Sequence, residues 1–219
     1  MRCTGVPAKA MRRQRGMSLI VVLLLLIITT VLGVGAASLS LVNEKGARND
    51  RDLEVAFQAA EAALQDAELD ITGPNRSRKA RLCAFSEKGD VSAFKAGCGE
   101  DAASRGLCLG SPAGDAPAWL GVSFSSDDAR SVELGTFTDQ TYLAADKDNP
   151  RGVSTARRPR YVIEALPNNG GYAPNELVGA GADQRTYLFR VTAIGYGVRA
   201  ETQVVLQGIV RKFNASPGC

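Results

Sequence analysis

Residues 17–42 read MSLIVVLLLLIITTVLGVGAASLSLV, a run of 26 residues without a charged side chain. As a helix this run would be roughly 39 Å long, because each residue adds about 1.5 Å. The hydrocarbon core of a bilayer is about 30 Å thick, so the run can cross it. The run is also longer than the apolar core of a secretory signal peptide, usually about 7–15 residues. The sequence therefore predicts one membrane-spanning helix.

The charges on either side of this run predict its orientation. Residues 1–16 carry five basic residues and no acidic one. Because basic flanks stay in the cytoplasm, the chain beyond the span is expected in the periplasm or outside the cell. That remainder has 21 basic and 23 acidic residues, without the basic excess that nucleic-acid binding needs. We therefore expect no nucleic-acid partner.

Histidine is absent from the chain, which removes the commonest general base and the commonest metal ligand. The sequence also contains no P-loop, dinucleotide-binding, hydrolase or zinc-protease motif. We expect a protein that is not an enzyme, with no catalytic residue, no cofactor and no metal.

Four of the five cysteines follow the apolar run: Cys83, Cys98, Cys108 and Cys219. An even number of cysteines in an oxidising compartment indicates two disulfides. Their spacing contains no C-x-x-C pair, which disfavours zinc. We expect one bridge among the first three cysteines and a second one to the chain end. The sequence does not choose among the three connectivities.

The helical pattern continues beyond the span. Apolar residues recur at spacings of four and three, which places them on one helix face: Leu53, Phe57, Ala60, Leu64 and Ala67. We expect this face to pack under a globular head. Gly73 and Pro74 supply a helix end. The sequence thus predicts one helix from about Met17 to Ile71.

The C-terminal part is strand-like. Residues 160–166, 187–194 and 200–210 are rich in β-branched and aromatic residues, and Gly195-Tyr196-Gly197 lies between the last two. This pattern predicts an antiparallel hairpin. The expected fold class is α+β and pilin-like, with a long N-terminal helix packed on a C-terminal antiparallel β-sheet and a disulfide-containing loop region.

The junction before the apolar run resembles a type III signal sequence, the cleavage site of prepilin peptidase. A short basic leader ends in Gly16, and Met17 follows at once. The resemblance implies cleavage after Gly16 and methylation of Met17. The expected segments are then a leader (1–16), a transmembrane half-helix (17–42), an amphipathic half-helix (43–72) and a globular head (73–219).

Residues 49–64, NDRDLEVAFQAAEAAL, resemble the N-terminal signature of the PilX family of minor type IV pilins. The segments PRYVIE, FRVTAIGYG and VVLQ resemble its C-terminal region. The resemblance implies a non-enzymatic structural subunit in a tip or initiation complex, which primes pilus assembly for twitching motility and adhesion.

One position departs from most pilins, which carry Glu at the fifth mature residue, here Val21. In a filament core a carboxylate costs several kcal/mol when it has no partner. A subunit at the tip has no neighbour above it to supply that partner. Val21 therefore favours a tip or initiation role, as in the PilX group.

The resemblance also implies partners and a location. The partners would be prepilin peptidase, other minor pilins of the PilV, PilW and FimU/PilE type, the major pilin and a PilY-type tip adhesin. The chain would cross the inner membrane once with a periplasmic head and then enter a cell-surface pilus, where Gly33 and Gly35 would allow close helix packing.

Two alternatives remain open at this point. A GspK-like minor pseudopilin of a type II secretion system shares the leader, the span and the missing Glu, although its head is usually larger. An uncleaved single-pass periplasmic scaffold or binding protein would keep residues 1–16.

Overall fold

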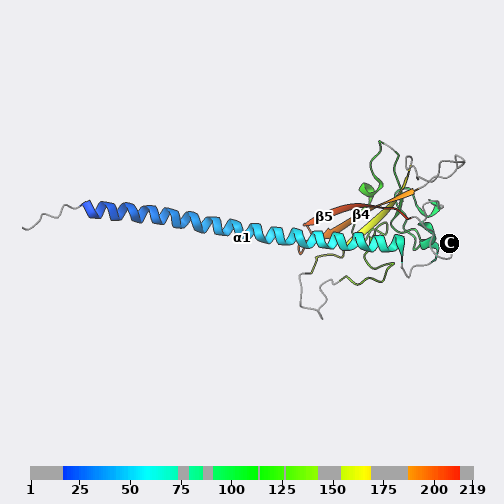
Figure 1. The fold of residues 1–219 in the computed structure, drawn as a ribbon, viewed down its shortest axis with the longest axis horizontal. Helices are drawn as coiled ribbons and strands as arrows, with labels where there is room; N and C mark the ends of the chain where they lie inside the picture. Colours follow the sequence, from blue (N-terminus) through cyan, green and yellow to red (C-terminus); the bar gives the residue numbers. More distant parts are fainter. Residues whose placement is uncertain are drawn as a thin grey trace, which may run out of the picture. The chain divides into compact units, whose positions relative to one another are not determined.

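The computed structural model describes residues 17–73, 79–85, 91–112, 114–125, 127–142, 154–168 and 187–212. The chain divides into two units, Met1–Arg48 and Asn49–Cys219. Its elements are α1 (Met17–Thr72), α2 (Lys79–Ala84), η1 (Val91–Ala93), β1 (Leu107–Leu109), η2 (Ala118–Gly121), β2 (Val132–Glu133), β3 (Arg160–Pro167), β4 (Tyr187–Tyr196) and β5 (Gln203–Val210) (Figure 1).

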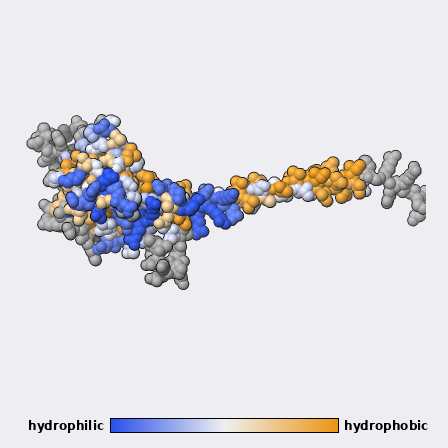
Figure 2. All heavy atoms as spheres, turned by 180° about the vertical axis from the view of Figure 1, so that it is seen from behind, coloured by the Kyte–Doolittle hydropathy of each residue, from blue (hydrophilic) through white to orange (hydrophobic). Residues whose placement is uncertain are grey.

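The part of α1 in the first unit is apolar and exposed. Its large apolar side chains between Leu19 and Val42 are 45–73% exposed, and they form a hydrophobic surface along this segment (Figure 2). By length and composition, α1 can cross a membrane. The hydroxyls of Thr29 and Thr30 donate to carbonyls one turn back, which satisfies these polar groups inside a lipid environment.

The five described strands form one sheet in the second unit, in the order β1-β3-β4-β5 with β2 also paired to β3. β3, β4 and β5 are antiparallel neighbours, so the predicted hairpin is confirmed. The sheet is mixed, however, because β1 runs parallel to β3. The sequence pattern missed β1, since a three-residue strand from the cysteine region is too short to show alternation.

The second half of α1 lies against this sheet (Figure 1) through a face of small residues. Five alanines are completely buried on it: Ala56, Ala59, Ala60, Ala63 and Ala67. A Cβ atom added to Gly195 of β4 would lie 2.2 Å from the Ala56 oxygen and 2.2 Å from the Ala60 nitrogen. The backbone of β4 therefore rests on the backbone of α1.

The predicted packing face of α1 is only partly correct. Ala60 is buried and Leu64 packs at the edge of the core, as expected. Leu53 and Phe57 are 52% and 39% exposed, so the prediction that they pack under the head is wrong. Alanine side chains let the sheet approach closely and make dense contact, whereas leucine and phenylalanine at the same positions would hold it away.

Aromatic side chains fill the core beside this interface. Phe85 packs edge-on against Phe94 and Phe189, and Phe94 stacks on Phe189. On the other face of β3, Val162 packs with the disulfide between Cys98 and Cys108. Neighbouring strand residues point to opposite faces, so the sheet is covered by α1 on one side and, near β3, by the disulfide region on the other.

Candidate assembly site

The residues expected to act in filament assembly lie on the exposed half of α1. Val21 is 54% exposed on the apolar helix. An added Cβ atom at Gly33 or Gly35 would meet nothing within 4 Å, so their predicted role in close helix contacts stays a prediction. Gly16 lies outside the described residues, and Met17 is described only as the first residue of α1.

Asp52 fastens the β4–β5 turn to α1. Its carboxylate accepts hydrogen bonds from the Thr202 hydroxyl at 2.6 Å, from the Val198 amide at 2.5 Å and from Arg199 Nε at 2.9 Å. The hydrogen bond from Thr202, followed by those from Arg199, lowers the pKa of Asp52 to about 2 against the opposing effect of burial. Asn49 adds an acceptor for the Arg199 guanidinium at 2.9 Å.

Asp70, which lies 18 residues beyond Asp52 on α1, anchors the segment that contains α2. Arg81 donates to both carboxylate oxygens of Asp70 at 2.9 and 2.6 Å, and both side chains are almost fully buried. The Tyr161 hydroxyl donates to the same carboxylate at 3.1 Å. The Arg81 guanidinium also lies 3.6 Å from the centre of the Phe137 ring. Burial and the charge of Asp70 raise the pKa of Tyr161 well above its ordinary value.

Asp66 and the C-terminal end of α1 bind two further segments of the head, one at residues 135–138 and one at Lys212. The Asp66 carboxylate accepts hydrogen bonds from the Thr138 hydroxyl and from the Gly135 amide, the latter at 2.9 Å. Burial raises the pKa of Asp66 despite these bonds. Lys212 donates to the Ile71 carbonyl at 2.6 Å, which satisfies a backbone acceptor in the last turn of α1. Burial lowers the pKa of Lys212.

Sequence reasoning missed these polar anchors. Asp52, Asp66 and Asp70 recur on the same face as the buried alanines. The available signal was the spacing of these aspartates relative to the alanines. That spacing places the carboxylates on the same helix face as the alanines, which is the face that the head covers.

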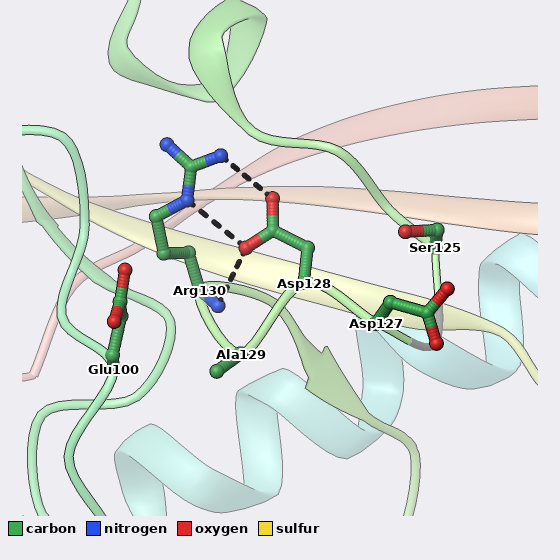
Figure 3. A pocket seen from close by; sticks show the side chains of 6 residues that line it. All are labelled: Glu100, Ser125, Asp127, Asp128, Ala129 and Arg130. Carbon is green, nitrogen blue, oxygen red and sulfur yellow. Dashed lines mark hydrogen bonds and ion pairs between the residues drawn. The ribbon is translucent and has the colours of Figure 1, made fainter.

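The head surface has a shallow depression of about 430 Å³, lined by Glu100, Ser125, Asp127, Asp128, Ala129 and Arg130 (Figure 3). Inside it, Arg130 donates to Asp128 at 2.8 and 2.9 Å, and these bonds lower the pKa of Asp128. Within the described part of the chain, no group of three or more His, Cys, Asp or Glu side chains is placed to hold a metal. The depression is therefore a polar surface in which the charges of Arg130 and Asp128 pair with each other.

One of the two predicted disulfides is confirmed. Cys98 and Cys108 form one disulfide, which is the bridge expected among the first three cysteines. Cys83 is also disulfide-bonded. Cys219, the predicted end of the second bridge, lies outside the described residues, so that pairing stays a prediction.

Comparison with known protein families assigns both ends of the chain. Residues 15–65 match the model of the PilX N-terminal region, and residues 83–212 match that of the C-terminal region of the type IV pilus assembly protein PilX. No curated protein and no solved structure shows significant similarity to the chain. Together with the apolar helix and the helix-on-sheet head, the two matches show that this chain belongs to the PilX family of type IV pilus assembly proteins, minor pilins that associate with other minor pilins.

Proposed function

We propose that this chain is a non-enzymatic minor pilin of a tip or initiation complex, which primes pilus assembly and thereby supports twitching motility and adhesion. Prepilin peptidase cuts after Gly16 and exposes Met17. The apolar segment 17–42 then leaves the inner membrane and enters a bundle of sister helices. The head faces the periplasm before assembly and the cell surface afterwards.

The exposure of the first half of α1 supports assembly through this helix. A row of apolar side chains that are 45–73% exposed would be unfavourable in water. Lipid, and then neighbouring helices, would cover these side chains. Gly33 and Gly35 present no side chain, which permits close approach of a second helix. The partners we propose are other minor pilins of the PilV, PilW and FimU/PilE type, the major pilin and a PilY-type tip adhesin.

Val21 is the observation that carries the tip assignment. It follows Gly16 by five positions, where most pilins carry the Glu that pairs with the amine of the neighbouring subunit. Val21 lies in an apolar segment, 54% exposed, and needs no such partner. A subunit with this side chain can occupy the end of a filament, where a carboxylate would lack its partner.

The first experiment compares the intact mass and N-terminal sequence of the protein in cells with and without prepilin peptidase. We expect a chain that begins at Met17, with an added methyl group, only when the peptidase is present. A chain that still begins at Met1 in peptidase-containing cells would refute the proposal. Deletion of the gene distinguishes a pilus role from a secretion-system role. We expect the deletion strain to lose surface pili and to keep type II secretion.

The tip assignment has its own test in Val21→Glu. A gold-labelled antibody against the head is applied to pili from cells that produce either chain. We expect it to mark only the pilus ends for the parent chain. For Val21→Glu we expect it to mark the shaft as well, since the new carboxylate can pair inside the filament. Val22→Glu introduces the same charge one position out of register and serves as the control. Shaft labelling of the parent chain as strong as that of Val21→Glu would contradict a tip role.

A further inference from the structure

The outer edge of β5 is open among the residues that the structure describes, because β5 pairs with β4 alone. The Gly197 amide donates to the Thr202 carbonyl at 2.8 Å, and this pair continues the β4–β5 register. Inward-bonding residues alternate with outward-bonding ones in an antiparallel ladder. The backbone groups that point away from β4 are therefore those of Gln203, Val205, Gln207 and Ile209.

The same four residues carry the exposed side chains of β5. Exposure alternates along the strand, with Val205 at 42% and Ile209 at 66%. The intervening residues face α1, since a Cβ atom added to Gly208 would lie 3.4 Å from the Leu64 side chain. Open backbone groups and apolar side chains thus coincide at Val205 and Ile209.

This edge lacks the features by which soluble proteins protect a strand from pairing. Such features are charged side chains, proline, bulges and short length. β5 reads QVVLQGIV, eight residues with neither a charge nor a proline. Its bonds to β4 run in unbroken register from Gln203 to Val210, so no bulge interrupts it. Among the described residues, none hydrogen-bonds to the outward backbone groups.

We propose that the open edge of β5 receives an extended strand from another subunit of the same pilus. Main-chain hydrogen bonds to residues 203, 205, 207 and 209 would supply the attachment, as in other cases of strand addition. The proposal rests on the proposed function, because the partner is a pilus subunit and not a soluble ligand.

Charge defines the partner strand more closely. An acidic or basic side chain opposite Val205 or Ile209 would lose water beside apolar groups and find no opposite charge on β5. The fitting strand is therefore uncharged and has apolar residues at alternate positions. A different subunit is the occupant we assign, since PilX-family proteins associate with other minor pilins.

Photo-crosslinking in pilus-forming cells tests the occupant. A photoreactive amino acid is placed at position 205 or 209 of the full chain, with Leu120 of η2, 58% exposed, as the control position. We expect adducts with another subunit from 205 and 209, at partner residues four apart in one segment, because paired strands advance together. Adducts with a second copy of this chain, scattered adducts or no adducts would overturn the proposal.

Lysine substitutions test whether assembly needs the edge. Val205→Lys combined with Ile209→Lys leaves the β4 ladder intact, and we expect it to lower the number of surface pili about tenfold, equivalent to about 1.4 kcal/mol. Leu120→Lys makes the same change elsewhere and should keep the parental level. Protein level and the oxidised Cys98–Cys108 bridge report folding. If pili are lost on deletion of the gene but retained in the lysine variant, strand addition at the β5 edge is refuted and the proposed function stands.

Discussion

Substitution of Gly195 by alanine tests the close contact between β4 and α1. The new Cβ would lie 2.2 Å from the Ala56 oxygen and from the Ala60 nitrogen, and 2.9 Å from the Ala59 carbonyl carbon. All three are helix backbone atoms, which cannot move aside as a flexible side chain can. Overpacking usually costs about 1–3 kcal/mol, and we expect about 3 kcal/mol here, because relief requires the whole helix to move from the sheet.

The measurement is thermal unfolding of the full chain in detergent micelles, followed by the fluorescence of Trp119, the only tryptophan. A loss of about 3 kcal/mol corresponds to roughly 6–12 °C for a chain of this size. Gly208→Ala is the matched control, since its Cβ would meet only the Leu64 side chain, at 3.4 Å. Both variants gain the same strand preference of alanine over glycine. Equal melting temperatures for the two would refute the inferred backbone contact.

Further substitutions test the polar anchors and the disulfide. Arg81→Met should cost about 3–5 kcal/mol in urea unfolding, since it leaves the buried Asp70 carboxylate without its guanidinium; an unchanged midpoint would contradict the pairing. The pKa of Asp52 is lowered from 3.8 to about 2, so its stabilisation is present above the ordinary value and lost as pH falls towards 2. Urea midpoints should therefore fall more steeply between pH 4 and pH 2 for the parent chain than for Asp52→Asn, and parallel curves would count against this linkage. Replacing Cys98 and Cys108 together by serine should cost about 3 kcal/mol, the chain-entropy value for a short loop; chemical denaturation of the non-reduced parent and the double variant measures it, and equal stabilities would show that this bridge does not constrain the unfolded chain.

Local patterns were sufficient to predict the long helix and the C-terminal hairpin of this chain. The helix from Met17 is set by an uncharged run and by continued helical spacing, and it ends at Thr72, next to Gly73, where the sequence predicted its end. The hairpin follows from two β-rich segments around Gly195 and Gly197. Each of these predictions depends on neighbours within a few residues, where propensity and periodicity act.

The face of α1 that meets the head could not be predicted in the same way. Hydrophobic periodicity selected Leu53 and Phe57, which are exposed, together with the buried Ala60 and Ala67. It passed over four other residues that are buried on this face: Asp52, Ala56, Ala59 and Ala63. The outcome depends on how closely the sheet approaches, and that distance is set by Gly195, more than 130 residues further along the chain. A carboxylate on this face is acceptable only because the β4–β5 turn brings Thr202 and two backbone amides to it.

The sequence by itself therefore determined the membrane-length helix, the strands of the hairpin, the four cysteines beyond the span and the resemblance to PilX, because all of these are properties of contiguous residues. Only the tertiary structure decided the buried face of α1, the pairing of Cys98 with Cys108, the parallel strand β1 and the open edge of β5. These features arise from contacts between segments far apart in the chain, where steric fit and the satisfaction of buried polar groups outweigh local preference.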